Sequence, residues 1–391
     1  MKRLLGLLGS TVLAFVIAAC GTASDGAEEG GANANDRSDG TSSEGDRLET
    51  GAMAISPSGA YIVARRNATT LIVDVQGQKL VELDVLGERF VFSKKREVVY
   101  AILANRQGVV AIDLATTKEL WRTVPAFTST AGAFLARVTD DDTTLLVADY
   151  DRLFFIGAAD GDVRTVAKVG ELPVDLELVP DQKQAIVVAR TRWENGGPQT
   201  PVSLVSLADA RVATIDVPNC AAPISVLADG SRALLSPTFC TPDAELQKQG
   251  WKNPDPVSVI DIDPAKGSLS FVKNLPGFGP VAMLADGRAV AYLDMKRIDP
   301  AMFDDKAQIP PATAPQYHLM TIEPRSMRFD LHAIGATLPR FAPAKDGKSL
   351  LVDASVQVVR TEASASITID PSGKISAEVK GAFGDTSGSL F

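Results

Sequence analysis

The most constraining feature of this chain is a repeated series of short apolar runs separated by turn residues. The stretch Ala52–Val85 contains four such runs, and a Ser-Pro-Ser-Gly turn at Ser56–Gly59 separates the first two. Short runs rich in β-branched residues between such turns predict a four-stranded antiparallel meander. One meander cannot cover both of its faces, so a chain that repeats it must stack the copies.

The turn between the first and second strands serves as a ruler for counting the copies. It recurs at Ser58-Gly59, Lys94-Lys95, Asp141-Asp142, Asp181-Gln182, Asp229-Gly230, Asp286-Gly287 and Asp346-Gly347. Second and third strands follow each turn, and the mean spacing of roughly 50 residues suits a propeller blade. We therefore predict an all-β fold, a seven-bladed β-propeller of four-stranded antiparallel blades, over residues 49–391. The first strand begins near Ala52 and the last ends near Lys380, so the ring is expected to close without exchange of strands between the termini.

Two of the repeats resemble known propeller families. Ala54–Gly59 together with Leu71–Asp74 resembles the YVTN class of seven-bladed propeller repeats. Val109–Trp121 is similar to the quinoprotein-type blade motif, which implies that Trp121 docks between blades. Thr117 stands where that motif has glycine, and no other repeat carries the tryptophan. The Trp-Asp ending of WD repeats is missing.

The N-terminus reads as an export signal. Lys2 and Arg3 precede the apolar run Leu4–Ile17, which is too short for a permanent membrane span. Ile17-Ala18-Ala19-Cys20 then resembles the lipobox of bacterial lipoproteins. This implies a signal peptide over residues 1–19 and a lipid, such as diacylglycerol with palmitate, on Cys20. The alternative is ordinary cleavage after Ala19, which leaves Cys20 as a free thiol.

Residues 20–48 are rich in Gly, Ser, Ala, Asn and acidic residues and hold no aromatic side chain, which predicts a disordered tether. Gly21 after the cysteine is compatible with the outer membrane, so we expect a protein held at the outer membrane or cell surface of the bacterial envelope rather than at the inner membrane. The formal charge of −9 argues against nucleic acid as a partner. We expect a monomer.

Three long segments between second and third strands are the candidate binding surface. In this topology such segments share one face of the ring, and they belong to neighbouring repeats, so we expect a raised wall that binds a protein, peptide or glycan. They are Arg192–Thr200, Ser236–Asp255 and Met295–Gln316, and their candidate anchors are Trp193, Trp251, Met302 and Phe303. The alternative is that these are insertions that pack on each other.

Cys220 and Cys240 flank the Asp229-Gly230 turn almost symmetrically. In an antiparallel pair they lie opposite each other within a residue, at a separation that suits a disulfide. An exported compartment permits the bond, which we expect to hold the following long segment.

Catalytic and metal-binding patterns are weak. The chain has two histidines and no paired-histidine zinc motif, and it has no Ser-based or phosphate-binding motif, so no catalytic residue and no cofactor are predicted. Asp140–Asp142 occupies the turn position and reads as solvated turn residues. Asp299, Asp304 and Asp305 are the better, though weak, candidates for a cation.

These observations favour a membrane-anchored interaction scaffold over an enzyme. One alternative is a hydrolase resembling propeller lactonases, with acidic residues around the central mouth. Another is an assembly scaffold like the lipid-anchored quinoprotein-type propellers of outer-membrane insertion machinery. A stoichiometric divalent ion in purified protein would favour the enzyme.

Overall fold

The computed structural model describes residues 53–66, 69–74, 79–104, 107–127, 135–180, 183–194, 197–237, 256–284, 286–296, 299–335, 340–343, 350–353, 356–358, 361–369 and 375–380. The expected signal peptide, Cys20 and the expected tether lie outside these residues, so their structure stays a prediction. None of the described residues belongs to a helix that is long and apolar enough to cross a bilayer.

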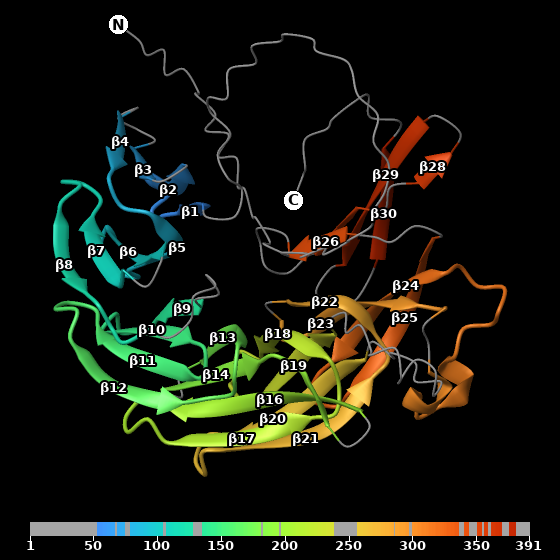
Figure 1. Cartoon of the computed structure of the whole chain (residues 1–391). Coiled ribbons are helices and arrows are strands. Elements are labelled where there is room, and N and C mark those ends of the chain that lie inside the picture. The colour runs from blue at the N-terminus through green and yellow to red at the C-terminus, as the bar shows by residue number, and fades with distance from the viewer. Residues whose placement is uncertain are drawn as a thin grey trace, which may run out of the picture.

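The described strands form seven antiparallel sheets, and each sheet consists of strands that follow one another in the chain. We number the sheets 1 to 7 in chain order. Figure 1 shows them set around a common centre, with the first strand of each sheet innermost. The predicted all-β class is confirmed, and no described strand of one terminus completes the sheet of the other.

Sheets 1 to 3 have four strands each. Sheet 1 contains β1 (Met53–Ile55), β2 (Tyr61–Arg66), β3 (Thr69–Asp74) and β4 (Lys79–Leu83). Sheet 2 contains β5 (Gly87–Phe92), β6 (Val98–Leu103), β7 (Val109–Asp113) and β8 (Glu119–Thr123). Sheet 3 contains β9 (Leu135–Val138), β10 (Thr144–Asp149), β11 (Arg152–Gly157) and β12 (Val163–Lys168).

The other four sheets complete the series. Sheet 4 contains β13 (Pro173–Val179), β14 (Gln184–Ala189), β15 (Arg192–Glu194), β16 (Gly197–Ser206) and β17 (Val212–Val217). Sheet 5 contains β18 (Ala221–Val226), β19 (Arg232–Pro237), β20 (Val257–Asp263) and β21 (Ser268–Leu275). Sheet 6 contains β22 (Phe278–Met283), β23 (Ala289–Asp294), β24 (Tyr317–Glu323) and β25 (Arg328–Gly335). Sheet 7 contains β26 (Arg340–Pro343), β27 (Leu350–Asp353), β28 (Val356–Val358), β29 (Thr361–Ile369) and β30 (Ile375–Lys380).

Burial falls from the middle of a sheet to its outer edge. The second strands β6 and β14 are buried at every position, because neighbouring sheets cover both of their faces. The outer strand β12 is mostly exposed. This explains why second strands read as continuous apolar runs in the sequence whereas outer strands carry polar residues.

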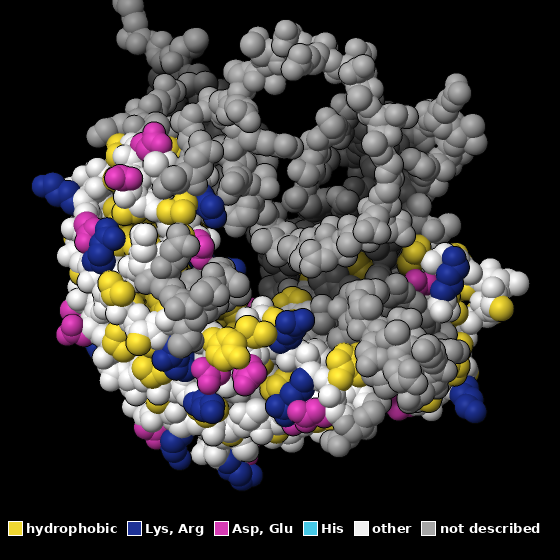
Figure 2. All heavy atoms as spheres, in the orientation of Figure 1, with side chains coloured by type: hydrophobic (Ala, Val, Ile, Leu, Met, Phe, Trp, Pro, Cys, Tyr) yellow, Lys and Arg dark blue, Asp and Glu magenta, His cyan; other side chains and the backbone are white. Residues whose placement is uncertain are grey.

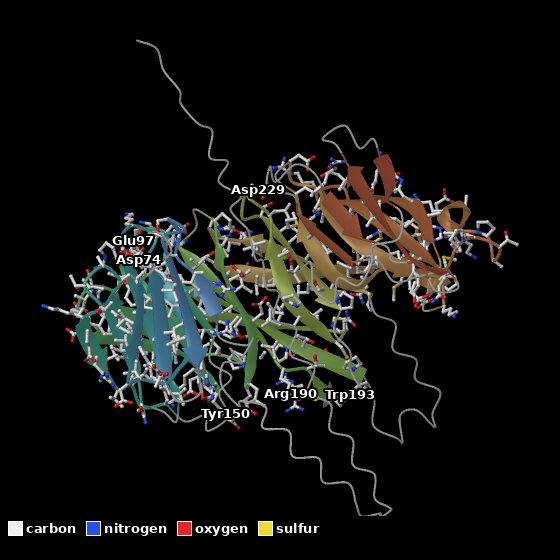
Figure 3. The ribbon with its side chains drawn as sticks, turned by 90° about the horizontal axis from the view of Figure 1, so that it is seen from above. Asp74, Glu97, Tyr150, Arg190, Trp193 and Asp229 are labelled. Atoms are coloured by element: carbon white, nitrogen blue, oxygen red, sulfur yellow. The ribbon has the colours of Figure 1, made fainter. Side chains whose placement is uncertain are left out.

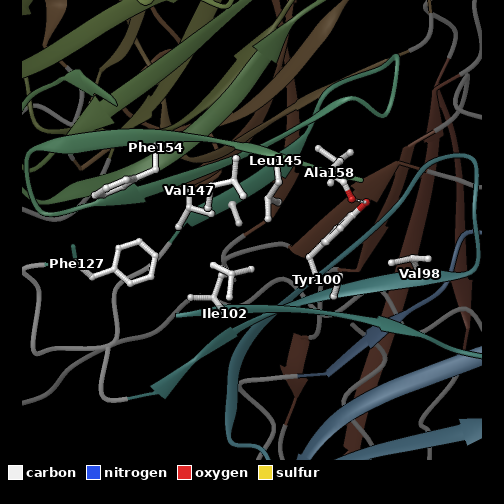
Figure 4. Packing of buried hydrophobic residues seen from close by; sticks show 13 residues of the cluster. Val98, Tyr100, Ile102, Phe127, Leu145, Val147, Phe154 and Ala158 are labelled. Atoms are coloured by element: carbon white, nitrogen blue, oxygen red, sulfur yellow. Dashed lines mark hydrogen bonds between the residues drawn. The ribbon is translucent and has the colours of Figure 1, made fainter. Parts of the chain in front are cut away.

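The core lies between adjacent sheets. Between sheets 2 and 3, Tyr100 and Ile102 of β6 pack with Leu145 and Val147 of β10 (Figure 4). Apolar side chains buried in this way are stabilised by roughly 1.5–3 kcal/mol each relative to exposure. Similar clusters lie between each successive pair of sheets from sheet 1 to sheet 6, so these sheets depend on their neighbours.

Trp121 of β8 joins sheets 2 and 3, which confirms the expectation that it docks between neighbouring sheets. Its indole Nε1 donates to the carbonyl oxygen of Ala158 at 3.2 Å, and its ring centroid is 5.8 Å from that of Tyr100. The indole also covers Gly161 so closely that a Cβ there would be 2.5 Å from the Trp121 ring.

The two faces of the ring carry the connections that the meander topology assigns to them. Figure 3 shows Glu97 and Asp229, from turns between first and second strands, on one face. Tyr150 and Trp193, from connections between second and third strands, lie on the other face. We call the second one the Trp193 face.

Two sheets depart from the expected four strands. The segment Arg192–Thr200, read from the sequence as a loop, forms a hairpin in which Arg192, Trp193 and Glu194 pair with Gln199, Pro198 and Gly197. Sheet 7 has a similar extension, in which β28 pairs with β29. The long third strands β16 and β29 supply the unpaired edge on which each extra strand forms.

Candidate functional site

The four predicted aromatic and methionine anchors differ from one another in where they lie and in how far they are exposed. Trp193 is half-buried on the hairpin β15–β16, and Trp251 lies outside the described residues. Met302 is half-buried in the 3₁₀ turn η2 (Pro300–Met302).

Phe303 is buried, at 5% exposure, so its assignment as a binding anchor is wrong. Its ring meets Phe329 edge to face at a centroid distance of 5.6 Å, within the apolar cluster between sheets 5 and 6. The long segment folds back on its own sheet, which buries the largest apolar side chain that the segment offers.

The three aspartates weighed as cation ligands have structural partners instead. Asp299 and Asp305 cap η2 and η3 (Lys306–Gln308) by accepting the backbone N–H of Ala301 and Ala307. The Asp304 carboxylate lies 2.7 Å from Lys273 Nζ. No group of three or more metal-ligating side chains occurs among the described residues.

Cys220 is buried, at 1% exposure, directly before β18. Cys240 lies outside the described residues, so the Cys220–Cys240 disulfide stays a prediction.

On the Trp193 face, backbone hydrogen bonds tie three connections together. The N–H of Leu172, between sheets 3 and 4, donates to the carbonyl oxygen of Tyr150 at 2.6 Å. The N–H of Arg190, next to the Trp193 hairpin, donates to the carbonyl oxygen of Leu172 at 2.9 Å. We call Tyr150, Leu172, Arg190 and Trp193 the platform; Figure 3 shows Tyr150, Arg190 and Trp193 together on this face.

Two platform residues hold a backbone conformation that is rare for their type. Tyr150 has φ 53° and Leu172 has φ 54°. The left-handed region costs an L-residue other than glycine roughly 1–2 kcal/mol, and Asn or Gly usually fills it. Tyr150 is nevertheless 41% exposed, so its ring contributes to the surface rather than to the core.

Ion pairs fix the hairpin that carries Trp193. Arg192 pairs with Glu194 on its own strand at 3.0 Å and with Asp216 of β17 at 3.0 Å. The hydroxyls of Thr191 and Thr200 are 2.7 Å apart and form a hydrogen bond. The hairpin is therefore held against sheet 4, and the platform presents aromatic side chains on a stiff support.

A second group of candidate side chains lies on the innermost strands of sheets 2 to 4. Arg89 is on β5, Arg137 on β9, and Asp175 and Glu177 on β13. We call these four residues the channel quartet. Figure 2 shows an opening at the centre of the ring with basic and acidic side chains at its rim.

β-Bulges set the direction of two members of the quartet. The register of β5 shifts between Gly87 and Arg89, and the register of β13 shifts between Pro173 and Asp175. A bulge re-aims the side chain that follows it and is common beside functional sites. Gly87 and Pro173 stand at these bulges, and glycine or proline in a strand is a sequence signal for a bulge.

The quartet is electrostatically coupled. Arg137 Nη2 lies 2.6 Å from Glu177 Oε1. Burial lowers the pKa of Arg89, and the neighbouring charge of Arg137 lowers it further, whereas Asp175 acts in the opposite direction. Burial raises the pKa of Asp175, although its two oxygens accept the backbone N–H groups of Ile224 and Leu176 at 2.8 and 2.9 Å.

Sequence reasoning missed Tyr150 and the quartet. Tyr150 occupies a two-residue turn between β10 and β11, where Asn or Gly is usual. A tyrosine in such a turn is a sequence signal that could have drawn attention to this position. Charged residues inside the apolar runs of first strands are a second signal, as in Arg89 and Arg137.

Comparison with known proteins supports the fold. No family model matches the chain, and no curated protein matches it. Among solved structures, the dihydro-heme d1 dehydrogenase NirN is similar with a TM-score of 0.51 and 15% identity, over 84% of this chain and 66% of that one. Hydrazine synthase of Kuenenia stuttgartiensis has a TM-score of 0.47 and 14% identity, over 84% and 95%. Hsv2 of Kluyveromyces lactis has a TM-score of 0.47 and 9% identity, over 84% and 97%. NirN is a β-propeller protein, and its similarity together with the sheets described above shows that the chain has a propeller fold.

Proposed function

We propose that this protein is a lipid-anchored scaffold of the bacterial envelope. In this proposal a seven-bladed propeller, tethered through Cys20 at the outer membrane or cell surface, binds a protein partner with its Trp193 face. The lipobox-like N-terminus supports the anchor, and the platform supports the binding role.

The observation that carries the binding role is the strained, exposed Tyr150. A tyrosine in the left-handed region costs stability that asparagine would not, and the described neighbours do not bury its ring. Strain of this kind persists where surrounding bonds impose it, and it concentrates at functional positions. Rigid aromatic side chains are also the residues that most often dominate protein interfaces.

The hydrolase alternative has less support. The carboxylates on the innermost strand β13, Asp175 and Glu177, are engaged by backbone N–H groups and by Arg137 respectively. A general base or nucleophile needs an oxygen that can reach a substrate. We therefore favour binding over catalysis.

The binding proposal can be tested by capture from envelope extract with the full-length protein as bait. Trp193→Ser is the test variant, and Glu97→Ala on the opposite face is the matched control. We expect a defined protein to be recovered with the wild type and the control, and at least tenfold less with Trp193→Ser. Equal recovery by all three proteins, or recovery of a glycan in place of a protein, would contradict the proposal.

The anchor has a separate test. Cells fed labelled palmitate should incorporate the label into the wild-type protein and not into Cys20→Ala. Absence of label from the wild-type protein, or equal labelling of both proteins, would exclude lipidation at Cys20.

A further inference from the structure

Three members of the channel quartet have partners among the described residues, whereas Arg89 has none. Glu177 pairs with Arg137, and both oxygens of Asp175 accept backbone N–H groups. The Arg89 side chain is open to solvent although surrounding protein atoms desolvate it in part, and no described side chain forms an ion pair or hydrogen bond with its guanidinium. One cation on the wall of the central channel is thus left without a partner among the described residues.

The surroundings of Arg89 make that charge costly. Protein atoms around it and the charge of Arg137 both lower its pKa. A ligand that brings a negative charge would relieve this cost, whereas water does so only in part. The guanidinium presents its N–H donors in a planar fork that matches an oxyanion in two parallel hydrogen bonds.

We propose that the central channel binds a small organic ligand through its carboxylate, with Arg89 as the main contact and Arg137 as a second positive charge beside it. This site goes beyond the proposed scaffold function and does not depend on the Trp193 face.

The acidic members of the quartet decide which anion fits. A carboxylate brings one negative charge, whereas phosphate brings nearly two at neutral pH. Glu177 and Asp175 lie on the strand beside Arg137, and like charges close together repel, so they disfavour the more highly charged anion. The quartet therefore selects a monocarboxylate over phosphate.

The test is a titration of the full-length protein with N-acetylglycine, monitored by ligand-detected NMR, with sodium chloride matching the ionic strength. For a ligand with so few atoms we expect a dissociation constant on the order of 1 mM. Inorganic phosphate is the second arm and should show no saturable binding in the same range. Equal or tighter phosphate binding would overturn the carboxylate assignment.

Three variants locate the site. Arg89→Gln should weaken N-acetylglycine binding at least tenfold, and Arg89→Lys should give an intermediate loss because lysine keeps the charge without the planar fork. Arg164→Gln, on the outer strand β12, should leave binding unchanged. If Arg89→Gln does not fold, Arg89→Lys still decides. Wild-type affinity in both Arg89 variants, or no saturable binding by the wild type, would overturn the proposal.

Discussion

Phe303 and Trp193 are both aromatic residues in segments that follow a second strand, but their surroundings differ. Phe303 packs against Phe329, whereas Trp193 stands opposite Pro198 at the rim of sheet 4. The sequence offers no means of telling them apart, since neither segment has a periodicity that assigns a buried side. Burial is decided here by how each segment folds back on its sheet.

Replacement of Phe303 should test this difference. Phe303→Ala is expected to destabilise the protein by about 3–5 kcal/mol, because it removes a buried ring and leaves a cavity. Met302→Ala, at the neighbouring half-buried position, should cost clearly less. Urea unfolding measures both. Equal losses would indicate that Phe303 is not a core residue.

At Tyr150 stability and binding should move in opposite directions. Tyr150→Asn places a residue that tolerates positive φ in the left-handed turn, so we expect stability that is unchanged or higher by up to about 1 kcal/mol. Capture of the partner should fall at the same time. Denaturation and capture with one preparation give both readings; a clear loss of stability would show that the tyrosine ring supports the fold instead.

Two glycines with similar backbone angles separate strain from packing. Gly161 has φ 77° and Gly59 has φ 73°, but a Cβ on Gly161 meets Trp121 at 2.5 Å and one on Gly59 meets nothing within 4 Å. Gly59→Ala should cost roughly 1 kcal/mol, the price of the backbone conformation alone. Gly161→Ala should cost more, and Trp121 fluorescence should change only in that variant. Similar costs would show that Trp121 does not depend on Gly161.

The predicted disulfide between Cys220 and Cys240 can also be tested at the level of single residues. We expect a peptide map under non-reducing conditions to contain one linked pair, Cys220 with Cys240, in wild type and in Cys20→Ala. A closed loop of this length stabilises a fold by about 3 kcal/mol in the chain-entropy view. Labelling of Cys220 by a thiol reagent in unfolded, unreduced protein would contradict the bond.

At the scale of elements, the second strands were predictable because their burial on both sides makes them continuous apolar runs between turn residues. The strand β6 (Val98–Leu103), buried at every position, is such a run. The hairpin β15–β16 was not predictable, because its pairing depends on the edge offered by the long strand β16 rather than on its own polar residues. Gly87 and Pro173 mark the bulges of β5 and β13 in the sequence, but the grouping of Arg89 with Asp175 depends on contacts between neighbouring strands.

Sheet 6 should make the fold sensitive to acid. His318 of β24 is buried and His332 of β25 lies 2.9 Å from the Thr321 hydroxyl; burial lowers the pKa of both imidazoles. The unfolded chain then binds protons that the folded sheet resists, so stability is present above pH 6.5 and falls as the pH drops below it.

The measurement is the urea midpoint at pH 7.5 and at pH 5.5. We expect the drop between these values to be smaller in His318→Leu than in wild type. The carboxylates common to both proteins serve as the internal control. An identical drop would show that this histidine does not contribute to acid sensitivity.

At the scale of the whole molecule, the repeat of strands and turns was sufficient to predict a radial stack of antiparallel sheets, and the TM-score of 0.51 with NirN supports the propeller fold. It was not sufficient to locate the proposed binding surface. The sequence favoured a wall formed by sheets 4 to 6, whereas the structure joins connections of sheets 3 and 4 through the backbones of Tyr150, Leu172 and Arg190. Such hydrogen bonds between distant segments leave no pattern in the order of residues.

The most direct test of the central claim, that the Trp193 face binds a protein partner, is photo-crosslinking in intact cells. A photoreactive amino acid replaces Trp193 in one strain and Glu97, on the opposite face, in another, within the full-length protein. We predict one discrete crosslinked protein from position 193 and none from position 97. The same product from both positions, or no product from position 193 in protein that is folded and exported, would contradict the account.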